Sequence, residues 1–265
     1  MTEAPAGRRT AFKRFFTGRR YGSGYAPEYP LIGGAHMHVI AVASRKGGSG
    51  KTTLTGHLAV AAERAGVKPA LVIDTDPQGN LAQWWNARQE QTPLFARASA
   101  ERLRAGIARI RDLGVALLII DTPPAIETTL TDVIGIADLV LIPVRPSPHD
   151  LRAAGATVAL VEHLAKPFVF AVNAATARTR IATEAVMALS QHGTVAPVII
   201  HHRTGFASSM IDGRTVMEIP GDERSAQEIE QLWAYLDNRL NRNYCTILPA
   251  LPAPTEPKED ETWAA

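Results

Sequence analysis

Glycines, a lysine and a hydroxyl side chain follow one another in the segment Lys46-Gly47-Gly48-Ser49-Gly50-Lys51-Thr52. Glycines allow the backbone to turn tightly and to point its N–H groups at the oxygens of a phosphate chain. A lysine at the end of such a loop reaches the β- and γ-phosphates, and the hydroxyl after it binds Mg²⁺. The segment therefore predicts a site for ATP or ADP with Mg²⁺. The residues expected to contact the nucleotide are Lys46, Gly47, Gly48, Ser49, Gly50, Lys51, Thr52 and Thr53.

The first position of this loop departs from the common pattern GxxxxGK[ST], because Lys46 stands where a glycine is usual. One bound nucleotide does not need a second lysine beside the loop. Lys46 could instead reach a phosphate held by a second subunit, as an arginine finger does in trans. The alternative is an ordinary lysine on the protein surface.

Three polar side chains stand at the ends of apolar runs: Asp74, Asp121 and Asn173. In a parallel sheet the carboxyl ends of the strands meet at one edge, and ligands bind there. Two carboxylates beside a triphosphate would repel it unless Mg²⁺ lies between them. This pattern predicts that the acidic residues and the phosphate loop form one magnesium–nucleotide site.

The elements that must position these residues alternate along the chain from His38, which predicts an α/β fold with a mostly parallel, twisted sheet covered by helices on both faces. Strands are expected at Val39–Ala43, Ala70–Asp74, Val115–Asp121, Leu139–Ile142, Phe168–Val172 and Val195–Ile200. Helices are expected at Lys51–Ala65, Gln78–Arg88, Ala100–Asp112, Glu127–Ile136, Pro148–Leu164, Ile181–Gln191 and Ser225–Leu240. The phosphate loop then joins the first strand to the first helix, as such a loop requires.

The composition fits one cytoplasmic globular domain, which we place at 38–243. The chain has 265 residues, of which 46% are apolar and 20% charged, a usual balance for such a domain. No apolar run approaches the ~20 residues of a membrane span. The single cysteine, Cys245, excludes a disulfide framework or a cysteine-ligated cluster within one chain and fits a reducing compartment.

The two ends of the chain differ in charge from the body. Within the segment 1–37, residues 1–20 contain one acidic residue, Glu3, and the basic residues Arg8, Arg9, Lys13, Arg14, Arg19 and Arg20. It is interpreted as a disordered leader, and the alternative is a basic arm that contacts nucleic acid or anionic lipid. The segment 244–265 is rich in proline and acidic residues and is expected to be a disordered tail.

Four segments of the chain together resemble the ParA/MinD family of deviant Walker A ATPases, which have the P-loop NTPase fold. The matching segments are KGGSGKTT at 46–53, VIDTDPQGN at 72–80, LLIIDTPP at 117–124 and PVRPSPHDL at 143–151. The resemblance covers about residues 38–240. It implies an enzyme that hydrolyses ATP slowly until a partner stimulates it, and that forms a homodimer with ATP between its subunits.

The resemblance also implies roles for the loop residues. Lys46 matches the signature lysine that contacts the nucleotide of the partner subunit. Lys51 matches the Walker A lysine, and Thr52 matches the ligand of Mg²⁺.

Further roles implied by the resemblance fall on the polar residues beyond the loop. Asp76 matches the aspartate that positions the attacking water, and Asp121 matches the Walker B aspartate that binds Mg²⁺ through water. Asn173 falls where the family has an asparagine that contacts adenine. Two roles stay open for Asp74: a functional role in the site, or a structural role in which it caps a helix or braces a loop. The expected catalytic residues are Lys46, Lys51 and Asp76.

The branches of this family differ in what they bind. A nitrogenase-like reductase needs cysteine ligands, which one cysteine cannot supply. A MinD-like protein ends in a basic amphipathic helix that lies on the membrane, whereas this chain ends in an acidic, proline-rich segment that anionic lipid would repel. We therefore expect no membrane partner and favour the ParA partition branch.

That branch binds DNA without sequence preference in the ATP state, so the protein is expected on the nucleoid. Such binding needs basic side chains that contact phosphates. The candidates, each of which could instead be a solvated arginine, are Arg178, Arg180, Arg203, Arg214 and Arg224.

The sequence leaves three functions open. The first is a partition ATPase that segregates a plasmid or chromosome with a ParB-like centromere-binding partner. The second is a ParA-like ATPase that positions a cytoplasmic protein cargo through an adaptor. The third is a nucleotide-gated regulatory module that scarcely hydrolyses ATP.

Overall fold

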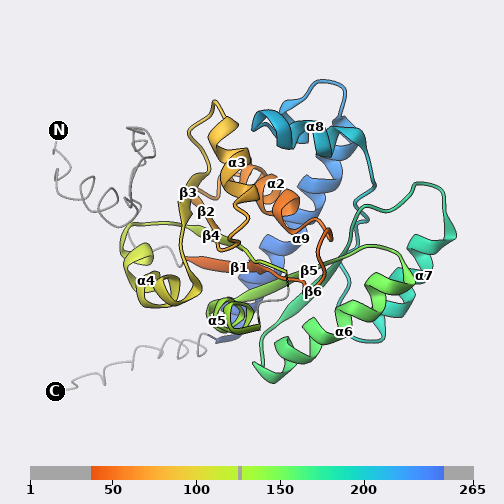
Figure 1. Cartoon of the computed structure of the whole chain (residues 1–265), viewed down its shortest axis with the longest axis horizontal. Helices are drawn as coiled ribbons and strands as arrows, with labels where there is room; N and C mark the ends of the chain where they lie inside the picture. The colour runs from red at the N-terminus through yellow and green to blue at the C-terminus, as the bar shows by residue number, and fades with distance from the viewer. Residues whose placement is uncertain (1–36, 125–126, 248–265) are drawn as a thin grey trace, which may run out of the picture.

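A six-stranded sheet forms the centre of the molecule, and its strands lie in the order β3-β2-β4-β1-β5-β6 (Figure 1). Every pair of neighbouring strands is parallel. The computed structural model describes residues 37–124 and 127–247. The strands are β1 (His38–Val42), β2 (Ala70–Asp74), β3 (Leu94–Arg97), β4 (Leu117–Asp121), β5 (Leu139–Val144) and β6 (Phe168–Val172).

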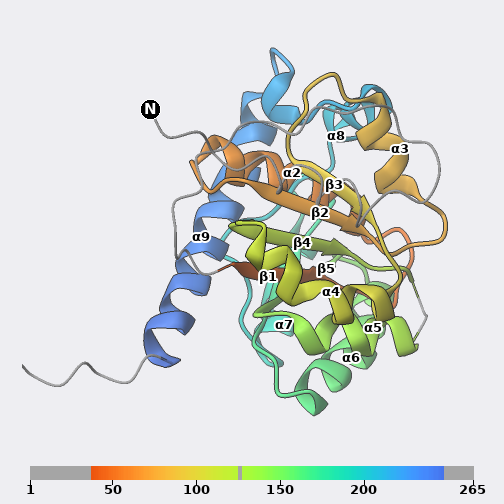
Figure 2. The same cartoon turned by 90° about the vertical axis from the view of Figure 1, so that its left-hand side faces the viewer.

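Helices follow the strands and cover both faces of the sheet (Figure 2). The helices are α2 (Lys51–Arg64), α3 (Asn80–Ala87), α4 (Ala100–Asp112), α5 (Glu127–Ile136), α6 (Pro148–His163), α7 (Arg180–Ser190), α8 (Thr204–Asp212), the short 3₁₀ helix η1 (Val216–Glu218) and α9 (Glu223–Ile247). Among residues 37–124 and 127–247, no helix is both long and apolar enough to cross a membrane. The expected α/β fold with helices on both faces is confirmed.

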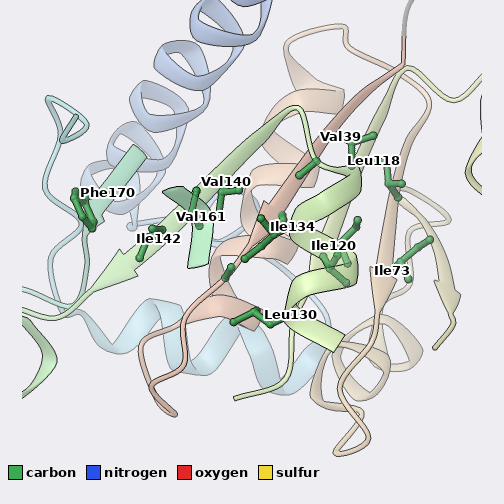
Figure 3. Packing of buried hydrophobic residues seen from close by; sticks show 14 of the residues in the cluster. Val39, Ile73, Leu118, Ile120, Leu130, Ile134, Val140, Ile142, Val161 and Phe170 are labelled. Atoms are coloured by element: carbon green, nitrogen blue, oxygen red, sulfur yellow. The ribbon is translucent and has the colours of Figure 1, made fainter. Parts of the chain in front are cut away.

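The buried strands divide the core into two layers because successive side chains of a strand point to opposite faces. Val39 and Ala41 of β1 pack in the layer formed with α4 to α7, part of which Figure 3 shows. Ile40 and Val42 pack in the other layer, with α2, α3 and α9. This two-sided burial explains why the strands are almost entirely apolar and places their polar ends at one edge.

One expected strand is wrong. Residues 195–200 run beside β6 but make only isolated bridges, Phe170 with Val195 and Ala175 with His201. The backbone N–H groups of Ala196 and Ile200 donate to β6. These donors are four residues apart, whereas their acceptors Phe170 and Val172 are two residues apart, so the register breaks and a continuous ladder does not form.

Three elements were not expected from the sequence, one of them the short 3₁₀ helix η1. The edge strand β3 is only four residues long, and α8 follows the irregular segment beside β6. The last helix, α9, also continues to Ile247, beyond the expected domain boundary at 243. The predicted basic leader, up to residue 36, and the tail from residue 248 lie outside the described residues.

Candidate nucleotide-binding site

The phosphate loop joins the end of β1 to the start of α2, and glycines set its conformation. Gly48 and Gly50 have positive φ angles of 72° and 93°, a region that other residues rarely adopt. Gly50 is also the N-cap of α2, so no side chain caps the first turn of this helix. The free N–H groups of that turn and the helix dipole together favour a bound phosphate.

Asn173, at the end of β6, lies directly against this loop. Its Nδ2 donates a 2.7 Å hydrogen bond to the carbonyl oxygen of Ser49. A Cβ atom on Gly50 would lie 2.1 Å from the same Nδ2. The predicted adenine-contacting residue is therefore brought to the loop, and the space it occupies is available only because residue 50 is glycine.

The ammonium group of Lys51 binds backbone oxygens at the start of the phosphate loop. It donates to the carbonyl oxygens of Ser44 and Lys46, at 3.1 Å each. Burial lowers the pKa of Lys51, and the charges of Asp121 and Asp76 partly offset this effect. An ammonium held by neutral carbonyl groups in a buried position gains strongly from an incoming phosphate.

Thr52 and Asp121 form the part of the site that fits Mg²⁺. The Thr52 hydroxyl donates a 2.7 Å hydrogen bond to Asp121 Oδ2. Among the described residues, the buried Oδ1 of Asp121 has no hydrogen-bond partner. Burial raises the pKa of Asp121 to about 7, and the negative charges of Asp74 and Asp76 contribute in the same direction. A hydroxyl beside an unpartnered carboxylate oxygen suits a hydrated divalent cation, which prefers oxygen ligands.

The two aspartates after β2 have different environments. Both oxygens of Asp74 are used by the backbone: Oδ1 accepts from Asp76 N at 2.9 Å, and Oδ2 accepts from Ala82 N at 3.1 Å. These contacts favour the structural alternative for Asp74, since they fix the turn and the start of α3. The carboxylate of Asp76 accepts from the Gln78 N–H at 2.9 Å through Oδ1, and its charge acts on Lys51 and Asp121.

Lys46 and Thr53 lie at the rim of the site. The Lys46 side chain is exposed, while its carbonyl oxygen accepts from Lys51. Thr53 is half-buried in the first turn of α2. Lys46 therefore points its charge toward solvent, where a second subunit could be reached.

Two threonines that the sequence did not single out hold the strand ends together. Thr75 Oγ1 donates to the carbonyl oxygen of Asp121 at 2.6 Å. Thr122 Oγ1 donates to the carbonyl oxygen of Val42 at 2.9 Å. Thr75 directly follows Asp74, and Thr122 directly follows Asp121. Their place beside these aspartates was the one feature of the sequence that could have pointed to them.

The arginines proposed for DNA are not gathered on one element. Arg203 makes a bidentate ion pair with Glu228, with both N–O distances 2.7 Å. The same carboxylate accepts from the ring Nδ1 of His201 at 2.7 Å. Arg203 therefore braces the segment beside β6 against α9. Its hydrogen bond to Glu228 raises the pKa of the guanidinium further.

The other proposed arginines are exposed. Arg214 pairs with Asp212 at 2.6 Å, Arg178 and Arg180 lie at the start of α7, and Arg224 lies at the start of α9. Because α7 and α9 pack on opposite faces of the sheet, these side chains do not form one helical patch. DNA contact by any of them stays a prediction.

The family of the chain follows from its match to known sequences. Residues 40–249 match the family described as the CobQ/CobB/MinD/ParA nucleotide binding domain. The chain belongs to this family. The match begins within β1 and includes the phosphate loop and every strand that carries a site residue, so the resemblance to ParA/MinD proteins is confirmed.

Relatives within this family include proteins of different named roles. Maintenance of carboxysome distribution protein A of Gloeobacter kilaueensis is 36% identical over 126 residues, 47% of this chain and 56% of that protein. The protein of the same name from Halothiobacillus neapolitanus is 26% identical over 73% of this chain and 93% of its own length. Protein ParA of Rhizobium radiobacter is 30% identical over 72% of this chain and 80% of its own length.

Solved structures of family members share the fold. The MinD protein of Pyrococcus horikoshii in complex with Mg-ADP superposes with a TM-score of 0.67 at 15% identity, over 78% of this chain and 99% of that one. The apo McdA of Cyanothece superposes with a TM-score of 0.63 at 19% identity, over 74% of this chain and 99% of that one. The P-loop NTPase fold expected from the sequence is therefore confirmed.

Proposed function

We propose that this protein is a ParA-type ATPase that forms a homodimer around ATP, binds DNA without sequence preference and moves a cargo by switching between nucleotide states. One observation carries the enzymatic part of the proposal. Thr52 is paired with Asp121, whose buried Oδ1 has no hydrogen-bond partner among the described residues, and the charges of Lys51 and Asp76 both act on this carboxylate. A buried carboxylate oxygen without a partner is costly, and hydrated Mg²⁺ bound with ATP would supply that partner.

Each residue has a distinct task in hydrolysis. Lys51 holds the β- and γ-phosphates, and the N–H groups that start α2 bind the phosphate oxygens. Thr52 and Asp121 hold Mg²⁺, which when bound neutralises the charge that develops on the phosphates. Asp76 orients the water that attacks the γ-phosphate. Lys46 is exposed and reaches the nucleotide of the second subunit, so the nucleotide also stabilises the dimer.

Two cargoes fit this ATPase. The similarity to Protein ParA over most of both chains supports segregation of a plasmid or chromosome with a ParB-like partner. The similarity to two proteins named for carboxysome distribution supports the second candidate, the positioning of a cytoplasmic protein assembly through an adaptor. Both functions place the protein in the cytoplasm and, in the ATP state, on the nucleoid. A regulatory module that scarcely hydrolyses ATP is the third candidate.

Two measurements test these proposals. ATP turnover by the wild type and by Lys51→Ala tests the enzyme, and turnover that survives in Lys51→Ala contradicts it. Retention on non-specific DNA with ATP, ADP or no nucleotide tests the switch. Retention should occur only with ATP and weaken steeply as salt rises, because phosphate contacts release counterions. Among DNA-contact variants, Arg224→Glu tests an exposed candidate, whereas Arg203→Glu also breaks the pair with Glu228.

A co-purification experiment separates the cargoes. The dimer trapped in ATP should retain a centromere-binding protein if it partitions DNA, and an adaptor of a protein assembly if it positions that assembly. A protein that turns over no ATP with or without such a partner, yet binds one only in the ATP state, supports the regulatory module instead.

A further inference from the structure

Arg97, the last residue of β3, lies beside the turn that carries Asp76. Its partner in the sheet register is Asp74, the last residue of β2. The Nη2 atom of Arg97 donates to the carbonyl oxygen of Pro77 at 3.2 Å and approaches that of Asp76 at 3.4 Å. One guanidinium group thus contacts two successive carbonyl groups of the turn.

The turn is tight and ends at Gly79. Gly79 N donates to the carbonyl oxygen of Asp76 at 3.0 Å, and Gly79 has a positive φ of 69°. A Cβ atom at Gly79 would lie 3.4 Å from Arg97 Nη2, so the guanidinium packs closely on this glycine. Arg97 therefore contacts the turn at its start and at its end.

The turn is held from two sides. On the β4 side, the Thr75 backbone and hydroxyl both donate to the carbonyl oxygen of Asp121. On the β3 side, Arg97 supplies the contact. Within the turn, the Asp76 N–H donates to Asp74 Oδ1 and the Gln78 N–H donates to Asp76 Oδ1, both at 2.9 Å. Arg97 adds a contact from outside the turn, on the carbonyl oxygens of Asp76 and Pro77.

Arg97 acts on the backbone of the turn and not on the reacting groups. Its contacts are to carbonyl oxygens, and its positive charge opposes the effect of burial, which raises the pKa of the neighbouring Asp74. A planar guanidinium suits this task, because its N–H groups are fixed in one plane and lose little freedom when they bind.

We propose that Arg97 is a positioning residue for ATP hydrolysis, which holds the 76–79 turn so that the Asp76 carboxylate stays aimed into the site. This inference rests on the proposed role of Asp76. A displacement on the order of 1 Å costs roughly 100-fold in rate, so partial loosening of the turn is expected to lower kcat by about tenfold. ATP affinity, which depends on the phosphate loop, should change less than about twofold.

The test uses the full-length protein, with ATP affinity measured at equilibrium and kcat measured at saturating ATP. Arg97→Ala should lower kcat about tenfold at unchanged affinity, and Arg97→Lys should recover part of the loss. The matched control is Arg102→Ala, which removes an exposed arginine from the first turn of α4, and its kcat should equal that of the wild type. Thermal unfolding of each variant checks that the fold is kept.

Double variants test the role of Arg97 separately from the role of Asp76. In an Asp76→Ala background, Arg97→Ala should add no further loss, because there is no carboxylate left to aim. An equal loss in both backgrounds, or a wild-type kcat in Arg97→Ala, overturns the role of Arg97. If Asp76→Ala alone keeps the wild-type kcat, the proposed role of Asp76 fails first, and the assignment of Arg97 fails with it.

Discussion

Asn173 at the end of β6 donates a 2.7 Å hydrogen bond to the carbonyl oxygen of Ser49, although 124 residues separate the two along the chain. This bond makes the phosphate loop part of a structure that extends across the sheet edge, since β1 and β6 are separated by β5. The protein's own contacts therefore hold the loop in shape, and a preorganised loop lowers the entropic cost of binding.

Gly50→Ala should disrupt this arrangement and weaken nucleotide binding. The new methyl group would meet Asn173 Nδ2 at 2.1 Å, and alanine would have to adopt the positive φ of 93°. The left-handed conformation alone costs roughly 1–2 kcal/mol, so ATP affinity is expected to fall by about tenfold or more. Isothermal titration with ATP checks this. Gly155→Ala on α6, where a methyl group meets open space, is the control and should bind ATP as the wild type does.

Asp121→Asn should have opposite effects on activity and on the stability of the protein without Mg²⁺. The pKa of Asp121 is raised to about 7, so the folded protein binds this proton more tightly than the unfolded chain does. Stability is therefore lost as pH rises from the ordinary pKa of an aspartate toward about 7. At pH 8 without Mg²⁺, the asparagine variant should be more stable by up to about 4 kcal/mol, while its Mg²⁺-dependent ATP hydrolysis is lost.

Chemical unfolding at pH 5 and pH 8, with and without Mg²⁺, measures this difference. Asp112→Asn changes an exposed carboxylate at the end of α4 and should show no such dependence on pH or Mg²⁺. A stability gain in Asp121→Asn that is the same at both pH values would contradict the assignment.

His57 should make stability depend on acidic pH. This fully buried side chain on α2 hydrogen-bonds the Thr53 carbonyl through Nδ1, and its Nε2 accepts from the Val216 N–H at 3.2 Å and lies 3.3 Å from Ser209 Oγ. Burial lowers its pKa to about 4, while Glu218 and Arg88 nearby have opposing effects. The neutral ring is therefore the folded form, and protonation would turn the Nε2 acceptor into a donor facing another donor.

The sign of the effect follows from the lowered pKa. The contribution of His57 is complete above pH 6.5, the ordinary histidine pKa, and is lost as pH falls from there toward about 4. It amounts to roughly 3 kcal/mol over that window. The unfolding free energy of the wild type should fall more steeply there than that of His57→Gln. Replacement of the exposed His192 should leave the wild-type slope, and parallel slopes in wild type and His57→Gln would contradict the prediction.

Local sequence was enough to predict that Asp74, Asp121 and Asn173 meet at one edge of the sheet, because each ends or follows a short apolar strand and parallel strands bring their carboxyl ends together. It did not reveal that residues 195–200 fail to form a ladder, since an apolar run alone does not indicate which backbone groups pair. It also could not assign Arg203, because its partner Glu228 lies 25 residues away on α9. The difference between Asp74 and Asp76 likewise depends on Ala82, which approaches Asp74 only once α3 has formed.

The ion pair between Arg88 and Glu218 should contribute strongly to stability because it joins α3 to η1 in a nearly buried position. The guanidinium makes two hydrogen bonds to the carboxylate, at 2.7 and 2.9 Å, and a third to the Gly213 carbonyl. Only 3% of the Arg88 side chain is exposed. Burial alone would raise the pKa of Glu218, but hydrogen bonds from Arg88 and Thr215 outweigh it and keep this pKa below its ordinary value.

Arg88→Ala should therefore destabilise the fold by about 3–5 kcal/mol, because it leaves a carboxylate without its buried partner. The loss should shrink at acidic pH, since the stabilisation from Glu218 is present above its ordinary pKa and is lost as pH falls through the lowered value. Urea unfolding at pH 7 and pH 4 measures both effects. The matched control is Arg214→Ala, whose ion pair with Asp212 is exposed and whose removal should scarcely change stability. Equal losses in the two variants would show that burial does not govern the strength of the Arg88 pair.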